Sequence, residues 1–132
     1  MLTPEERKAL LTYRIEKAKG ILEEAKDNAK LGHWNLVGNR LYYSVYHMAH
    51  ALLLDKGFSA KIHAGTIHLI GQKFINGGML DKSYGRLFSR LYELRQSGDY
   101  DDMFDATEEE VKPYFPQVEA FLLEMEKLIN FV

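Results

Sequence analysis

The feature that most constrains the fold is the scarcity of proline, since none lies between Pro4 and Pro113. Proline breaks a helix interior, so this stretch is free to form long helices, and helix formers dominate it. No strand alternation, internal repeat or low-complexity segment is present. The sequence therefore predicts an all-α, antiparallel up-and-down bundle of four main helices plus one short helix. Helical spacing is clearest among the apolar residues near the N-terminus: Leu10, Leu11, Ile15, Ala18, Ile21, Leu22 and Ala25.

Start and stop signals divide the chain into elements. Thr3 and Glu6 form a capping-box pattern with Pro4 at the first helical position, and Thr107 with Glu110 repeats the box before the last helix. Asp81 is a cap for the fourth helix, and Gly32 and Gly57 are stops. Proline inside the last pattern predicts a kink or a delayed start. The predicted helices are Pro4–Leu31, His33–Lys56, Gly65–Ile75, a fourth ending near Ser97 and a last one after Thr107, with loops at 58–65 and 98–106.

Composition narrows the class of protein. The 132 residues suit a single domain over 1–132, and 46% hydrophobic with 27% charged residues is typical of a soluble globular chain. There is no cysteine, which excludes disulfides and thiolate sites and fits a reducing cytoplasm. No apolar run approaches 18 residues and the N-terminus lacks a signal-peptide pattern, so we expect no membrane association. The net charge of −2 means that nucleic acid would need a local basic patch.

The stretch 39–57, NRLYYSVYHMAHALLLDKG, mixes core residues with an unusual number of polar ones. On a helical wheel, Arg40 and His47 fall in one stripe, nearly in line and about 10 Å apart. One interpretation is a solvated or dimer-facing stripe. The other is a phosphate-binding arginine beside a histidine that titrates near neutral pH. The wheel gives a broad apolar face of Trp34, Leu41, Val45, Met48, Ala49 and Leu52, and an opposite stripe of Arg40, Tyr43, Ser44, His47, His50 and Ala51.

A second anomaly lies on the fourth predicted helix, where Arg95 falls at the angle of Phe88, inside the apolar sector. A charge aimed at the core is costly unless it is paired, and Asp99 or an acid in the following loop is the nearest partner. One hypothesis is an ion pair that locks the loop SGDY. The alternative is an arginine presented to a ligand at the edge of the bundle.

Other site patterns are weak or absent. Lys61 and His63 precede a predicted helix start and are a weaker anion-binding candidate, with an ordinary capping loop favoured. His68 does not share a face with His63. There is no Glu-x-x-His, His-x-Glu or His-Glu-x-x-His pattern and no glycine-rich phosphate loop, so we expect no metal and no cofactor.

Three motifs in order resemble one family. They are R-x-Y-Y-x-x-x-H in NRLYYSVYHMAHALLLDKGF, K-x-H-x-G in KIHAG, and L-R-x-x-x-D-Y in LRQSGDY. Together they resemble the HEPN superfamily, in particular its small stand-alone, toxin–antitoxin-associated branch, over about residues 10–130. The resemblance implies an antiparallel helical bundle, usually a homodimer, often working with a minimal nucleotidyltransferase. It also implies that catalytic members are metal-independent endoribonucleases with an R-x(4–6)-H motif at a site shared across the dimer, whereas others bind nucleotides or act as interaction modules.

The family's catalytic motif can be carried over in two ways. Arg40 and His47 have the required spacing, but the motif normally lies late in the bundle, where Arg95 matches and Tyr100 replaces histidine. A tyrosine, with a pKa near ~10, is a poor general base at neutral pH.

We therefore expect a module that dimerises and binds a nucleotide, RNA or a nucleotidyltransferase. The alternatives are a ribonuclease that uses Arg40 and His47, or Arg95, and a purely structural helical partner. The predicted binding residues are Arg40, Tyr43, His47, Lys61, His63, Arg95, Asp99 and Tyr100.

Overall fold

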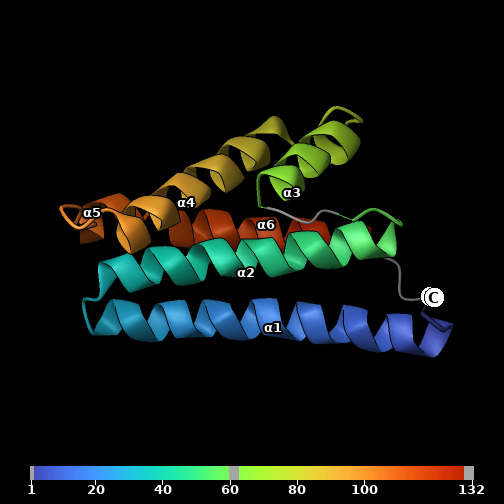
Figure 1. Cartoon of the computed structure of the whole chain (residues 1–132), viewed down its shortest axis with the longest axis horizontal. Coiled ribbons are helices and arrows are strands. Elements are labelled where there is room, and N and C mark those ends of the chain that lie inside the picture. The colour runs from blue at the N-terminus through green and yellow to red at the C-terminus, as the bar shows by residue number, and fades with distance from the viewer. Residues whose placement is uncertain (1, 60–62, 130–132) are drawn as a thin grey trace.

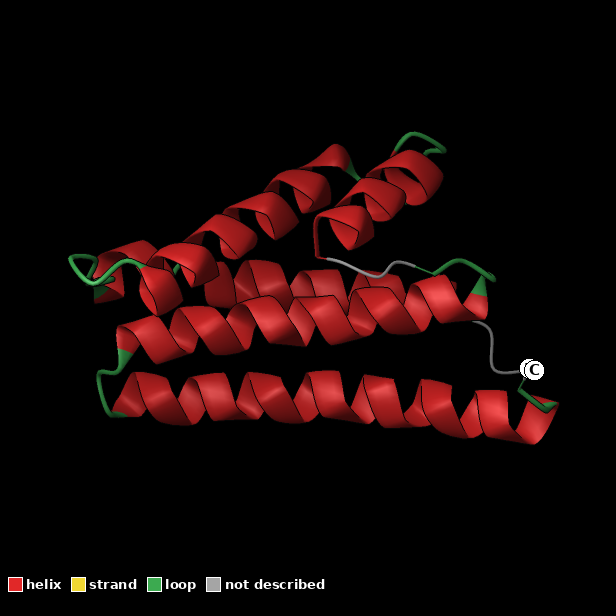
Figure 2. Cartoon of the chain, in the orientation of Figure 1, coloured by secondary structure: helices red, strands yellow, loops and turns green. Residues whose placement is uncertain are grey.

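The computed structural model describes residues 2–59 and 63–129, and every regular element in these ranges is a helix. The prediction of an all-α bundle is confirmed. Two short helices and one π-helical turn connect four long helices (Figures 1 and 2). The long helices are α1 (Pro4–Lys30), α2 (Trp34–Asp55), α4 (Lys82–Tyr100) and α6 (Tyr114–Leu128), and the shorter elements are α3 (His63–Ile70), η1 (Gly71–Ile75) and α5 (Glu108–Val111).

Helix α2 is the centre of the molecule. It contacts α1, α3, α4, α5 and α6, and α1 lies beside it along most of its length (Figure 1). The short turn between α1 and α2 makes the two helices antiparallel, while α4 and α3 slant across the opposite side (Figure 1). A helix surrounded in this way buries residues around most of its circumference, which decides how its polar side chains are placed.

The predicted helix starts are present. Thr3 Oγ1 accepts a hydrogen bond from the Glu6 amide at 3.0 Å, and the Glu6 carboxylate accepts from the Thr3 amide at 3.0 Å. Thr107 and Glu110 form the same reciprocal box before α5. The delayed start is also found, because α6 begins only after Pro113. Helices α1 and α2 end within one residue of the predicted positions, each followed by a glycine with positive φ.

Two boundaries differ from the prediction. Helix α3 begins at His63 instead of Gly65, since the His63 ring packs against the tyrosines of α2 and the first turn is held in place. Helix α4 continues through Tyr100, so the expected loop SGDY is its last turn. Asp99 therefore lies one helical turn after Arg95, on the same face.

The wheel prediction for α2 is also incomplete. The expected apolar face is buried apart from Trp34, which is half-buried. The opposite stripe is not a solvated surface, because α1 packs on that side. Ser44 and Ala51 are fully buried there, and Ser44 Oγ donates to the Ala18 carbonyl of α1 at 2.7 Å.

Candidate functional site

Arg95 is buried, and tyrosines surround its guanidinium. Its Nη2 donates to the Tyr43 hydroxyl at 3.0 Å. The guanidinium carbon lies 5.7 Å from the ring centroid of Tyr42, 5.4 Å from that of Tyr43 and 5.4 Å from that of Tyr100. Such positions over ring faces are attractive for a cation. The wheel prediction that Arg95 points into the apolar sector is confirmed.

Asp99 is the partner that the sequence indicated. Its Oδ2 lies 3.4 Å from Arg95 Nε, which is an ion pair by distance although Nε makes no hydrogen bond there. The Arg95 side chain is 9% exposed but that of Asp99 is 28% exposed, so the pair is not sealed from solvent. Tyr100, next in the chain, is 69% exposed. The arrangement is therefore a fixed arginine whose outer edge meets an open aromatic ring.

A chain of polar contacts extends from Arg95 across three helices. Asn39 Nδ2 donates to Asp99 Oδ2 at 2.9 Å, and Asn39 Oδ1 accepts from Arg40 Nε and Nη2 at 3.0 and 2.8 Å. Arg40 Nη1 in turn pairs with Glu24 on α1 at 3.0 Å. Sequence reasoning singled out Arg40 but missed Asn39, whose amide joins the two arginine groups. The only signal for Asn39 in the sequence was its position next to Arg40.

Tyr43 is the residue that brings the predicted site together. Besides its bond with Arg95, its ring lies 5.5 Å from the Arg40 guanidinium and 6.4 Å from the His47 ring. The His63 ring meets it edge to face at 5.9 Å. Arg40 and His47 thus lie against the same tyrosine without a hydrogen bond to each other.

His63 lies on the Arg95 side of this cluster. Its Nδ1 lies 2.5 Å from the Tyr42 hydroxyl, and its ring stacks on Tyr46 at 4.5 Å. Burial, and then the charge of Arg95, lowers the pKa of His63. Burial also raises the pKa of Tyr42 well above its ordinary value, so its hydroxyl stays protonated. Lys61, the predicted neighbour of His63, lies outside the described residues.

His47 is not poised near neutral pH as the sequence suggested. Burial and the nearby charges of Lys17 and Arg14 lower its pKa to about 4. The pKa of His50 is also lowered to about 4, mainly by burial. Its Nε2 lies 2.9 Å from Thr66 Oγ1. Both rings are therefore neutral at pH 7. The prediction failed because a wheel shows neither depth nor the charges on the neighbouring helix.

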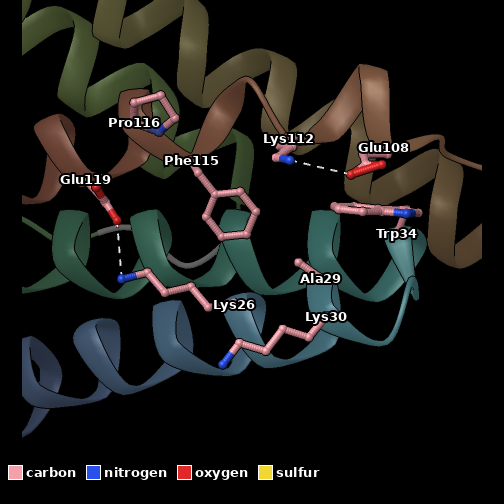
Figure 3. Close-up of a pocket in the computed structure, with 9 residues that line it drawn as sticks. All are labelled: Lys26, Ala29, Lys30, Trp34, Glu108, Lys112, Phe115, Pro116 and Glu119. Atoms are coloured by element: carbon pink, nitrogen blue, oxygen red, sulfur yellow. Dashed lines mark ion pairs between the residues drawn. The ribbon is translucent and has the colours of Figure 1, made fainter.

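A separate open groove of about 480 Å³ lies where the end of α1, the start of α2 and the α5–α6 segment meet (Figure 3). Trp34 and Phe115 line it, but its lysines are already neutralised. Lys26 pairs with Glu119 at 3.3 Å and Lys112 with Glu108 at 3.5 Å (Figure 3). None of the predicted binding residues lines this groove.

Between residues 2 and 59 and between 63 and 129, no group of three or more His, Asp or Glu side chains could hold a metal ion. Within the same ranges, no helix combines the length and the apolar character needed to cross a bilayer.

The fold and the ordered motifs agree with a comparison against known families. The sequence model of the HEPN domain matches residues 11–128. The chain belongs to the HEPN family. Within it, the chain is 33% identical to a UPF0332 protein of Thermotoga maritima over 95% of both chains. It is 35% identical to a Methanocaldococcus jannaschii protein named "putative toxin", over 93% of this chain and 97% of that protein, and 29% identical to an Archaeoglobus fulgidus UPF0332 protein, over 91% and 95%.

The segment that the family resemblance aligns with the late motif can now be described in three dimensions. Arg95 and Tyr100, at its two ends, are in contact on the last two turns of α4. Besides burial, the charge of Arg95 lowers the pKa of His63 from α3, whereas the charges of Lys17, Arg14 and Arg40 lower the pKa of His47. Arg40 and His47 are therefore close enough to interact electrostatically, and Tyr43 contacts both of them.

Proposed function

We propose that this HEPN protein is a toxin–antitoxin component that binds RNA at Arg95 and Tyr100 without cleaving it. The observation that carries the proposal is the contact between a fixed guanidinium and an exposed tyrosine ring, with 5.4 Å between the guanidinium carbon and the ring centroid. Proteins commonly hold single-stranded RNA by stacking bases on aromatic rings beside positive charges.

The geometry supports separate roles for Tyr100 and Arg95 in this site. Tyr100 stacks a splayed base, and the outer edge of Arg95 shares its charge between Asp99 and a phosphate. Tyr43 and Asp99 hold the guanidinium in one orientation, which lowers the entropy lost on binding. A free nucleotide offers the same base and phosphate, so it is the smaller ligand of this class.

The family resemblance motivates the partners that we include in the proposal. Two Methanocaldococcus jannaschii relatives carry the name "putative toxin", which supports a toxin role here. We extend the proposal to a homodimer and to a minimal nucleotidyltransferase as the second component. Met103, which is 92% exposed in the segment after α4, supplies apolar surface for a second copy.

A second candidate function, metal-independent RNA cleavage, is favoured by the position of His63. Its neutral imidazole contacts Tyr42 and Tyr43, the two tyrosines that also contact Arg95. In that reaction Arg95 would stabilise the charged phosphate and His63 would take the proton of the RNA 2′-hydroxyl. Tyr100 stands where the family motif has its base, which makes binding the primary proposal.

The test is RNA binding and cleavage in EDTA with a short fluorescent single strand. We expect binding without cleavage. Tyr100→Ala should weaken binding about fivefold or more, because stacking contributes about 1–3 kcal/mol per base. Tyr100→Phe keeps the ring and should bind within about threefold of wild type. Leu123→Ala, at another exposed apolar position, is the control.

The outcomes separate the two candidates. Absence of binding by the wild type, or equal binding by Tyr100→Ala, contradicts the primary proposal. Cleavage in EDTA that is lost in His63→Ala but kept in His47→Ala supports the ribonuclease instead.

A further inference from the structure

A basic cluster of Arg14, Lys17 and His47 lies where α1 packs against α2. The bond from Ser44 Oγ to the Ala18 carbonyl, 2.7 Å long, fixes the register of these antiparallel helices. One turn before Ala18 is Arg14, and one turn after Ser44 is His47, so the two come to the same level. Lys17 follows Arg14 by three positions and shares its side of α1.

The cluster lacks negative charge. No Asp or Glu within residues 2–59 and 63–129 lies at ion-pair distance from Arg14 or Lys17. Lys17 Nζ instead donates to the Tyr13 hydroxyl at 3.3 Å and lies 5.5 Å from the Tyr13 ring centroid. Several other basic residues of α1 are paired: Arg7 with Asp55 at 3.2 Å, Lys19 with Glu126 at 3.0 Å and Lys26 with Glu119 at 3.3 Å.

The cluster also contains two buried nitrogen atoms that lack a hydrogen-bond partner in the described ranges. Arg14 Nε and His47 Nδ1 are buried, and neither has a hydrogen-bond partner in the described part of the chain. Buried polar atoms are almost always paired, so two in one cluster call for an explanation. An anion at the open edge of the cluster would offset the uncompensated charge and orient both side chains.

We propose that Arg14, Lys17 and His47 form a phosphate subsite, which holds an RNA phosphate next to the one at Arg95. The residues differ from those of the Arg95 site, but the ligand class rests on the proposed function. Tyr43 joins the two positions, since it bonds to Arg95 and its ring lies 6.4 Å from that of His47. A phosphate is favoured over a protein carboxylate because three convergent donors suit its several oxygens.

The histidine gives the subsite a pH signature. His47 is faced by Arg14 and Lys17 from α1 and by Arg40, Tyr43, Tyr46 and His50 on its own helix, and its pKa is about 4 when no anion is bound. A bound phosphate favours the protonated ring and raises this pKa. By linkage, phosphate then binds more tightly as the pH falls from neutral toward 5.

The probe for the test is inorganic pyrophosphate, titrated at low salt while the His47 ring signals are followed by NMR. We expect saturable shifts of these signals. The double variant Arg14→Gln/Lys17→Gln should weaken pyrophosphate binding at least about tenfold, since two phosphate-binding charges are lost. The matched control, Lys8→Gln/Lys19→Gln, removes two charges from the same helix outside the cluster and should leave binding within about twofold.

The subsite is contradicted if pyrophosphate causes no saturable shift of the His47 signals, or if the control variant weakens pyrophosphate binding as much as Arg14→Gln/Lys17→Gln does. It is also contradicted if sedimentation shows that Arg14→Gln/Lys17→Gln dissociates a homodimer that the control variant leaves intact. This last result would make the cluster a protein interface. Because pyrophosphate has no base and this assay does not use Tyr100, failure of RNA binding and failure of the subsite are separate outcomes. If RNA binding and the phosphate subsite are both found, Arg14→Gln/Lys17→Gln should also lower the slope of log RNA affinity against log salt concentration by about one to two units.

Discussion

The Arg95 cluster and the Arg14 cluster differ in how the chain compensates the charge of the arginine. Arg95 is compensated within the chain by Asp99, the Tyr43 hydroxyl and three aromatic rings. Arg14 has no carboxylate partner in the described ranges, whereas its Nε, like that of Arg95, is buried without a hydrogen bond. The first arrangement stabilises the fold and leaves only an edge for a ligand. The second costs stability unless something from outside supplies negative charge.

This difference separates a structural contribution from a binding one. In the Arg95 cluster both are combined, since the same guanidinium holds α4 to α2 and reaches the exposed Tyr100. In the Arg14 cluster binding is separable from stability. Mutations should therefore affect folding strongly in one cluster and weakly in the other.

The largest expected effect comes from replacing each arginine by methionine, which keeps the aliphatic stem. Arg95→Met leaves Asp99 and the Tyr43 hydroxyl without their partner and should lower the free energy of unfolding by about 2–3 kcal/mol. Arg14→Met removes an uncompensated charge and should change it by less than about 0.5 kcal/mol, or raise it. Urea unfolding measures both. Equal destabilisation by the two variants would contradict the claim that the chain compensates the charge of Arg95 but not that of Arg14.

The second effect is a loss of stability in acid. His47 and His50 have pKa values of about 4 in the folded chain, whereas the ordinary pKa of histidine is 6.5, so the unfolded chain binds more protons between these limits. The free energy of unfolding therefore falls as the pH drops from 6.5 toward 4, by about 2 kcal/mol after allowance for partial solvent screening.

The control for this pH dependence is His47→Gln, which should lose about half of it when unfolding is measured at pH 7 and 4.5. An unchanged slope in that variant would mean that carboxylates, not the buried histidines, carry the effect.

The smallest expected effect is the change in unfolding free energy when the hydroxyl of Tyr43 or of Tyr13 is removed. Tyr43→Phe removes the partly buried acceptor of Arg95 and should cost about 1 kcal/mol in unfolding free energy. Tyr13→Phe removes the exposed acceptor of Lys17 and should cost less than about 0.3 kcal/mol. If Tyr13→Phe proves the more costly, the Arg14–Lys17 cluster is more tightly built than its contacts indicate.

Much of the fold could be predicted from local signals. The capping boxes at Thr3 and Thr107 and the glycine after each of the first two helices marked boundaries that the structure reproduces. The exception was Gly98, where the chain was expected to leave the helix, although α4 continues to Tyr100. A glycine inside a helix is tolerated when packing on both sides favours the helix, which local propensity does not reveal.

The site could be predicted only in part. The angle of Arg95 and its pairing with Asp99 followed from the helical period, because both are properties of one helix. The pKa of His47 and the joining role of Asn39 depend on which helix packs where. Arg14 carried an unused signal: it lies three residues after Leu11 and four before Ala18, inside the buried stripe of α1.

The most direct test of the account is an RNA titration followed by NMR through the arginine Nε–H signals. The account predicts that the signals of Arg95 and Arg14 both shift and saturate at the same RNA concentration. The indole signal of Trp34, the single tryptophan, should stay unmoved, since it lines the charge-balanced groove. Shifts confined to Trp34, or no shift at either arginine, would contradict the central claim that RNA lies along Tyr43 between the two clusters.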